Sequence, residues 1–103
     1  MEPIVVKVDP DLEDLIPGFL DNRRADVDKL RDLNAASNFA DIRIIGHSMK
    51  GAGGGYGFDE ITTIGDLIEQ AALASDTTTI EQQTDILADY LARVETVPDP
   101  DLD

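Results

Sequence analysis

His47 is the only histidine of the chain, and two cations flank it: Arg43 four residues before it and Lys50 three residues after it. Neutral imidazole is a nucleophile, and cations about one helical turn away would disfavour its protonated form and attract a phosphoryl group. A lone histidine is often a packing or surface residue without a chemical role. The segment 42–58 nevertheless contains no carboxylate, although the chain is acidic elsewhere. The pattern therefore favours His47 as a nucleophile that accepts an anionic group.

The composition restricts the classes of partner and of chemistry. The 103 residues include 8 Lys and Arg and 22 Asp and Glu, and the resulting net charge of −14 at pH 7 repels nucleic acids and anionic membranes. The absence of cysteine, together with the single histidine, excludes disulfides, thiol chemistry and an ordinary zinc site. No apolar run is long enough for a transmembrane helix, and the acidic N-terminus is unlike a signal peptide. We expect a cytoplasmic monomer that forms one domain over residues 1–103.

The elements that position His47 are expected to be helices, because apolar residues recur at helical intervals from residue 11 onward. Four amphipathic helices with short polar connections predict an all-α fold, an antiparallel four-helix bundle. A short extra N-terminal helix precedes them, since Pro17-Gly18 interrupts the first periodic segment. The β-rich sequence IVVKV finds no obvious partner strand, so residues 1–9 are expected to form an extended arm, and residues 97–103 a frayed acidic tail.

The helix that carries His47 is expected to run from about Ser37 or Asn38 to Tyr56, with Ser37 as its N-cap and Gly57 as a left-handed stop. Each residue advances about 100° around a helix, which places His47 opposite the apolar face. The apolar face consists of Ile42, Ile45, Met49, Ala52 and Tyr56. The solvent face around the histidine consists of Ala40, Arg43, Ile44, Lys50, Gly51 and Gly54.

The glycines that follow His47 should weaken the end of this helix, since each costs about 1 kcal/mol relative to alanine. One interpretation is a phosphate-binding loop, but the sequence matches neither common glycine motif, and no strand precedes it. The alternative is a helix end held by packing, in which Gly51 and Gly54 leave room beside His47 for another protein and Gly53 lies nearer the core.

These residues resemble the motif of the histidine-containing phosphotransfer (HPt) domains of multistep phosphorelays. That motif has an apolar residue two positions after the histidine, lysine at +3, glycine at +4, two small residues, an apolar residue at +9 and glycine at +10. The matching residues are His47, Met49, Lys50, Gly51, Ala52, Gly53, Tyr56 and Gly57. Met49 and Tyr56 stand where leucine is frequent, and the unbroken Gly53-Gly54-Gly55 departs from the pattern. The resemblance extends to the expected helices, with the histidine on the second of the four.

The resemblance implies that His47 accepts a phosphoryl group from a receiver-domain phospho-aspartate, or in a histidine kinase pathway, and passes it to a response-regulator aspartate. Lys50 would steady the phosphoryl oxygens, and Gly51 would leave room for the partner. The expected partners are receiver domains of response regulators or of hybrid histidine kinases, which would meet Ala40, Arg43, Ile44, Gly51 and Gly54. The chain would be a carrier rather than an enzyme, without its own cofactor or metal. Mg²⁺ would come with the receiver, because no carboxylate cluster is expected beside His47. The initial methionine favours a free-standing protein over a segment of a hybrid kinase.

Two other interpretations remain open. The sequence GHSM resembles the neighbourhood of the phosphopantetheine-bearing serine in acidic carrier proteins, which would make Ser48 the functional residue. In those domains the serine starts a helix, whereas here a helical pattern runs into Ser48. The third interpretation is a helical adaptor that uses the same surface without chemistry.

Overall fold

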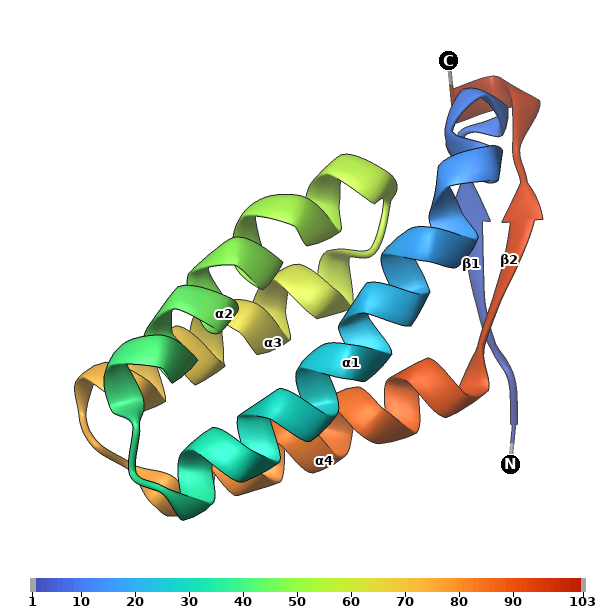
Figure 1. Cartoon of the computed structure of the whole chain (residues 1–103). Coiled ribbons are helices and arrows are strands. Elements are labelled where there is room, and N and C mark those ends of the chain that lie inside the picture. Colours follow the sequence, from blue (N-terminus) through green and yellow to red (C-terminus); the bar gives the residue numbers. More distant parts are fainter. Residues whose placement is uncertain (1, 103) are drawn as a thin grey trace.

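The computed structural model describes residues 2–102 and is mostly helical, as the periodicity predicts. Four α-helices account for most of the chain: α1 (Ile16–Ala35), α2 (Phe39–Gly53), α3 (Asp59–Leu73) and α4 (Thr77–Arg93). Short 3-10 helices span Pro10–Leu15, Gly54–Tyr56 and Pro100–Leu102. Two strands, β1 (Ile4–Val8) and β2 (Val94–Pro98), lie near the two ends of the chain (Figure 1).

The helix boundaries follow from local capping. Pro17 lies in the first turn of α1, where its missing N–H costs nothing, and the preceding short helix ends at Leu15 as predicted. The expected cap of α2, Ser37, is wrong. Ser37 lies in the left-handed region (φ 55°), and Oδ1 of Asn38 instead accepts a hydrogen bond from the backbone N–H of Asp41 at 3.3 Å. Asp76 caps α4 in the same way through the backbone N–H of Thr79.

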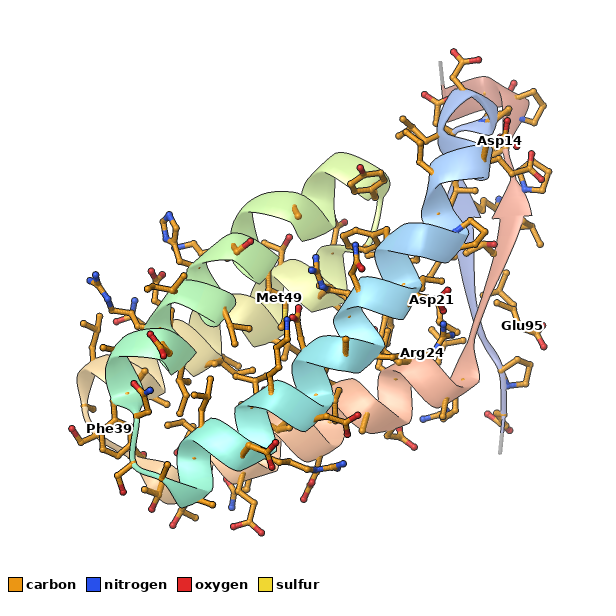
Figure 2. All side chains as sticks on the ribbon, in the orientation of Figure 1. Asp14, Asp21, Arg24, Phe39, Met49 and Glu95 are labelled. Atoms are coloured by element: carbon orange, nitrogen blue, oxygen red, sulfur yellow. The ribbon has the colours of Figure 1, made fainter. Side chains whose placement is uncertain are left out.

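The four helices enclose one hydrophobic core. The closest pairing is α2 along α3, and further contacts join α3 to α4, α4 to α1 and α1 to α2. The chain reverses direction at each connection between successive helices (Figure 1). Met49 lies on the side of α2 that faces the other helices and is fully buried, whereas Asp14, Asp21 and Glu95 point outward (Figure 2). The largest fully buried side chains include Phe58, Leu30, Ile42, Met49, Ile61, Ile68, Ile80 and Leu87.

The expected extended arm and frayed tail are wrong, because the two segments pair with each other. β1 and β2 form a parallel two-stranded sheet in which Ile4 faces Val94 and Val8 faces Pro98. Alternate side chains of β1 turn inward, and Val8 is buried in the core. Beyond β2, the backbone N–H of Asp99 donates to the carbonyl oxygen of Val8 at 2.9 Å. The partner of IVVKV therefore lies about ninety residues away, in a segment whose Val94 continues the helical spacing of α4.

Across residues 2–102, no helix combines the length and the apolar character needed to cross a membrane.

Candidate functional site

His47 lies midway along the outer face of α2, and its side chain is 75% exposed. The residues expected around it are exposed as well: Ala40, Arg43, Ile44, Lys50, Gly51 and Gly54. The opposite face enters the core, where Ile42 and Met49 are fully buried and Ile45, Ala52 and Tyr56 pack at the edge. The helical wheel therefore placed the imidazole and its surroundings correctly.

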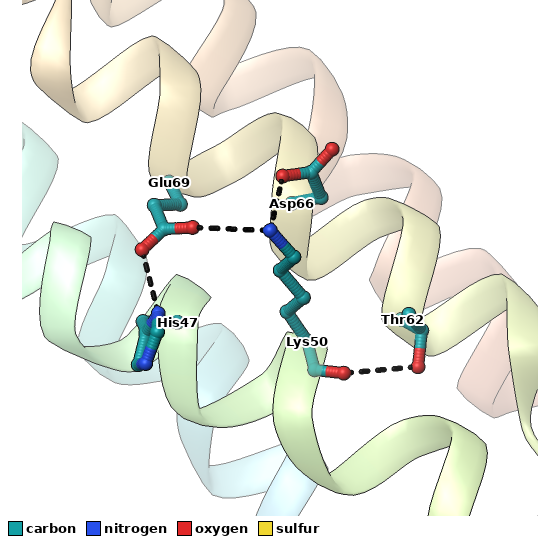
Figure 3. Close-up of polar contacts among 5 residues, drawn as sticks. All are labelled: His47, Lys50, Thr62, Asp66 and Glu69. Atoms are coloured by element: carbon teal, nitrogen blue, oxygen red, sulfur yellow. Dashed lines mark hydrogen bonds and ion pairs between the residues drawn. The ribbon is translucent and has the colours of Figure 1, made fainter.

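The imidazole of His47 is held by a carboxylate from the neighbouring helix. Nδ1 of His47 lies 2.8 Å from Oε2 of Glu69 on α3, whose side chain is only 13% exposed (Figure 3). An ionised carboxylate can only accept a hydrogen bond, so Nδ1 carries the proton and the lone pair resides on Nε2. Nε2 is the ring nitrogen left open to solvent. Sequence reasoning missed Glu69, which lies 22 positions away, and the available signal was the pair Asp66 and Glu69 on one face of the next amphipathic helix.

Lys50 is engaged by the same helix. Its Nζ lies 3.0 Å from Oδ1 of Asp66 and 3.7 Å from Oε1 of Glu69 (Figure 3). The hydrogen bond and charge of Asp66, followed by the charge of Glu69, raise the pKa of Lys50 above its ordinary value. The expectation that no carboxylates lie beside His47 is therefore wrong: they are absent from the sequence around the histidine, but α3 supplies them. The four side chains form a continuous row, Asp66–Lys50–Glu69–His47, which we call the α2–α3 polar row.

Close backbone contact between α2 and α3 makes this row reachable. A Cβ atom on Gly46 would lie 2.8 Å from the backbone nitrogen of Glu69, and one on Gly65 would lie 2.5 Å from the backbone nitrogen of Lys50. Real Cβ atoms essentially never approach backbone atoms so closely, so both positions require glycine for the observed approach. The two helices thus touch without intervening side chains, and the short reach of Glu69 is enough to contact His47.

The glycine-rich end of α2 is held by Thr62 of α3. The Thr62 hydroxyl donates to the carbonyl oxygen of Lys50 at 3.1 Å and accepts from the backbone N–H of Gly54 at 2.7 Å. The α-helix continues to Gly53, where a Cβ atom would lie 2.6 Å from the Thr62 hydroxyl oxygen, and a 3-10 turn follows. Gly57 then adopts the left-handed conformation (φ 90°), as predicted. Packing against α3 thus offsets the low helix propensity of this segment.

The outer glycines leave open space beside the histidine. A Cβ atom on Gly51 would meet nothing within 4 Å, and one on Gly54 would make only an ordinary contact with Thr62 at 3.6 Å. These positions therefore need no glycine for the packing of this chain. Their lack of side chains is consistent with clearance for a second molecule near His47.

A shallow hollow of about 460 Å³ adjoins the imidazole and is lined by Arg43, Ile44, His47, Ser48 and Glu69. Ser48 lies in the interior of α2, so it does not start a helix as the serine of a carrier domain does. Within residues 2–102, no group of three or more His, Cys, Asp and Glu side chains is placed to bind a metal ion. Asp66 and Glu69 are instead paired with Lys50.

The arrangement is suited to nucleophilic chemistry at one atom. The exposed Nε2 can attack an electrophile that arrives from solvent, and the proton on Nδ1 is retained by Glu69. The surrounding surface is flat and carries few large side chains. Comparison of the chain with protein-family models, with curated proteins and with solved structures gave no match in any of the three.

Proposed function

We propose that this protein is a phosphoryl carrier of a phosphorelay, in which His47 accepts a phosphoryl group from a receiver-domain aspartyl phosphate and passes it to another receiver aspartate. One observation carries the proposal: a 75% exposed imidazole whose Nδ1 is bound to Glu69, so that the nucleophilic Nε2 faces solvent. The resemblance of the residues from His47 to Gly57 to the HPt motif supports the same assignment.

The transfer step follows from the geometry of the imidazole. The lone pair of Nε2 attacks phosphorus, the Nε2–P bond forms, and the P–O bond to the donor aspartate breaks. The carboxylate of the donor leaves with the electron pair. The imidazole ring keeps its Nδ1 proton and gains positive charge, which the carboxylate of Glu69 at 2.8 Å stabilises. The return step to an acceptor aspartate is the reverse.

The divalent ion that such a transfer uses is assigned to the partner. Phosphoryl transfer passes through a loose transition state whose oxygens need charge neutralisation, commonly by Mg²⁺. The two carboxylates nearest to His47 are Asp66 and Glu69, and both bind Lys50. The receiver domain, with its own acidic pocket, would supply the Mg²⁺. The chain is thus a carrier whose transfer chemistry is assisted by its partner.

The partner surface is the area around His47. Ala40, Ile44, Gly51 and Gly54 form a low, weakly polar area, with Arg43 and Lys50 at its edge. A small interface of this kind suits a transient encounter, and charged groups at its edge affect the association rate more than the affinity. The chain of helix contacts from α1 through α2, α3 and α4 back to α1 supports an antiparallel four-helix bundle as the scaffold of this surface.

The decisive experiment is phosphoryl transfer from several phosphorylated receiver domains with Mg²⁺, on the native chain, on His47→Gln and on Ser48→Ala. The expected label appears on the native chain and on Ser48→Ala, is absent from His47→Gln, and is labile in acid and stable in alkali. Circular dichroism should show equal helicity in all three. A label that persists in His47→Gln would contradict the proposal, as would the absence of label with every receiver. A phosphopantetheine adduct on Ser48, detected by mass spectrometry, would favour the carrier-protein alternative.

A further inference from the structure

The two cations that flank His47 differ in what they contact. Nζ of Lys50 is bound by Asp66 and lies near Glu69, on the side of α2 that faces α3. Arg43 is exposed, and within the described residues 2–102 no carboxylate lies within 4.0 Å of its guanidinium. Arg43 also lines the hollow beside the imidazole, together with Ser48 and Glu69, whereas Lys50 does not.

We infer that Arg43, rather than Lys50, is the cation that contacts the phosphoryl group on Nε2 of His47, and that Lys50 is a positioning residue for Glu69. This inference rests on the proposed phosphoryl chemistry of His47. It changes the assignment that the HPt resemblance implies, in which the lysine three residues after the histidine binds the phosphoryl oxygens.

The chemistry of the two side chains supports this division. Residues four apart on a helix are neighbours on one face, so the long side chain of Arg43 reaches the region outside His47. A guanidinium presents two parallel N–H donors that match two phosphoryl oxygens, and it remains charged at all relevant pH values. An unpaired guanidinium need not break an existing ion pair before it binds the incoming group. Lys50 would have to leave Asp66 at 3.0 Å to do the same.

The contacts of Lys50 assign it a different role. Its Nζ lies 3.7 Å from Oε1 of Glu69, while the other oxygen of that carboxylate binds Nδ1 of His47. Asp66 holds the lysine on the opposite side from Glu69 (Figure 3). Lys50 therefore fixes one oxygen of Glu69 and leaves the second oriented toward the imidazole. Its effect on transfer is exerted through Glu69 and through the proton on Nδ1.

Potassium phosphoramidate tests this assignment without any receiver domain. Nε2 attacks its phosphorus, the Nε2–P bond forms, the P–N bond breaks, and ammonia leaves with the electron pair. The rate is followed by mass spectrometry on the native chain, on Arg43→Gln and Arg43→Lys, and on the double variant K50Q/D66N. The double variant removes the Lys50–Asp66 pair without a change in net charge. Arg31→Gln, on α1 against α4, is the control for the loss of one positive charge.

We expect Arg43→Gln to slow phosphorylation by about tenfold or more, and Arg43→Lys to recover part of that loss. Arg31→Gln and K50Q/D66N should stay within about threefold of the native rate. The ¹⁵N shifts of the His47 ring give a second readout: the double variant should lower the fraction of protonated Nδ1, and Arg43→Gln should leave it unchanged. Unchanged ring shifts in the double variant would remove the positioning role of Lys50.

A loss in Arg43→Gln no greater than in Arg31→Gln would overturn the assignment of Arg43, as would an equal or larger loss in K50Q/D66N. A native chain that phosphoramidate does not phosphorylate at His47 would overturn it too. The proposed phosphorelay function fails separately: phosphoramidate would then label His47, with the dependence on Arg43, while receiver domains would not.

Discussion

Gly46 of α2 and Gly65 of α3 face each other with their backbones in contact: a Cβ atom on Gly65 would lie 2.8 Å from the carbonyl oxygen of Gly46. His47 follows the first glycine directly, and Glu69 follows the second by one helical turn. The close approach therefore brings the carboxylate of Glu69 within 2.8 Å of the imidazole. The site depends on this pair of glycines as much as on the polar side chains.

Replacement of Gly65 or Gly46 by alanine should push the two helices apart. We expect a loss of about 1–3 kcal/mol in the free energy of unfolding, because the added methyl group meets backbone rather than a flexible side chain. Urea denaturation of each variant gives this value. The matched control is Gly51→Ala, where the space is open, and it should stabilise the helix by up to about 1 kcal/mol. Equal stabilities for Gly65→Ala and Gly51→Ala would contradict the proposed contact.

Glu69→Gln should slow phosphoryl acceptance while the fold is retained. A hydrogen bond to a charged group contributes about 1.5–3 kcal/mol, which corresponds to a roughly tenfold to hundredfold change in rate. Transfer from a receiver domain and the ¹⁵N shifts of the His47 ring should change together, because both depend on the proton at Nδ1. Glu81→Gln removes the same charge from α4 and serves as the control. A changed ring protonation with an unchanged rate would mean that Glu69 does not assist transfer.

A glutamine at Gly51 or Gly54 should block the partner without harming the nucleophile. We expect transfer from a receiver domain to fall by about tenfold or more, since a long side chain would occupy the open space beside His47. Phosphorylation by small phosphoramidate should remain within about threefold of native. Gly18→Gln on α1, where a side chain also meets open space, is the control and should change neither rate. If both donors were slowed equally, the effect would lie in His47 itself rather than in clearance.

Tyr90 should make the fold sensitive to alkaline pH. Its side chain is 3% exposed, and burial, followed by the charges of Glu60 and Asp59, raises the pKa of Tyr90 to about 12. The unfolded chain releases this proton near pH 10, so the contribution is fully present below pH 10 and is lost as pH rises toward 12. The loss amounts to about 2–3 kcal/mol, since one pKa unit corresponds to about 1.4 kcal/mol.

Urea denaturation of the native chain and of Tyr90→Phe at pH 7, 10 and 11 measures this contribution of Tyr90. The phenylalanine variant keeps the ring and lacks the titrating hydroxyl, so it should gain stability relative to the native chain above pH 10. A difference between the two proteins that does not change from pH 7 to pH 11 would show that Tyr90 is not the titrating group.

The parts of this structure that could be predicted from the sequence depend on local rules. Helical spacing located the four helices, Pro17 marked the start of α1, and Gly57 marked the end of the segment that carries His47. The angular position of each residue on α2 separated the buried Met49 from the exposed His47. These features require only the geometry of one helix and the difference between apolar and polar side chains.

The tertiary structure alone decided the long-range contacts. Neither the pairing of β1 with β2 nor the contact of Glu69 with His47 has a local signal, because each depends on how distant segments pack. From the sequence, His47 had only Arg43 and Lys50 as charged neighbours. In the fold, Gly46 and Gly65 bring α3 close enough for its carboxylates to bind both the imidazole and Lys50. The sequence thus determined which residue faces solvent, whereas helix packing decided the hydrogen bond that leaves Nε2 as its nucleophilic atom.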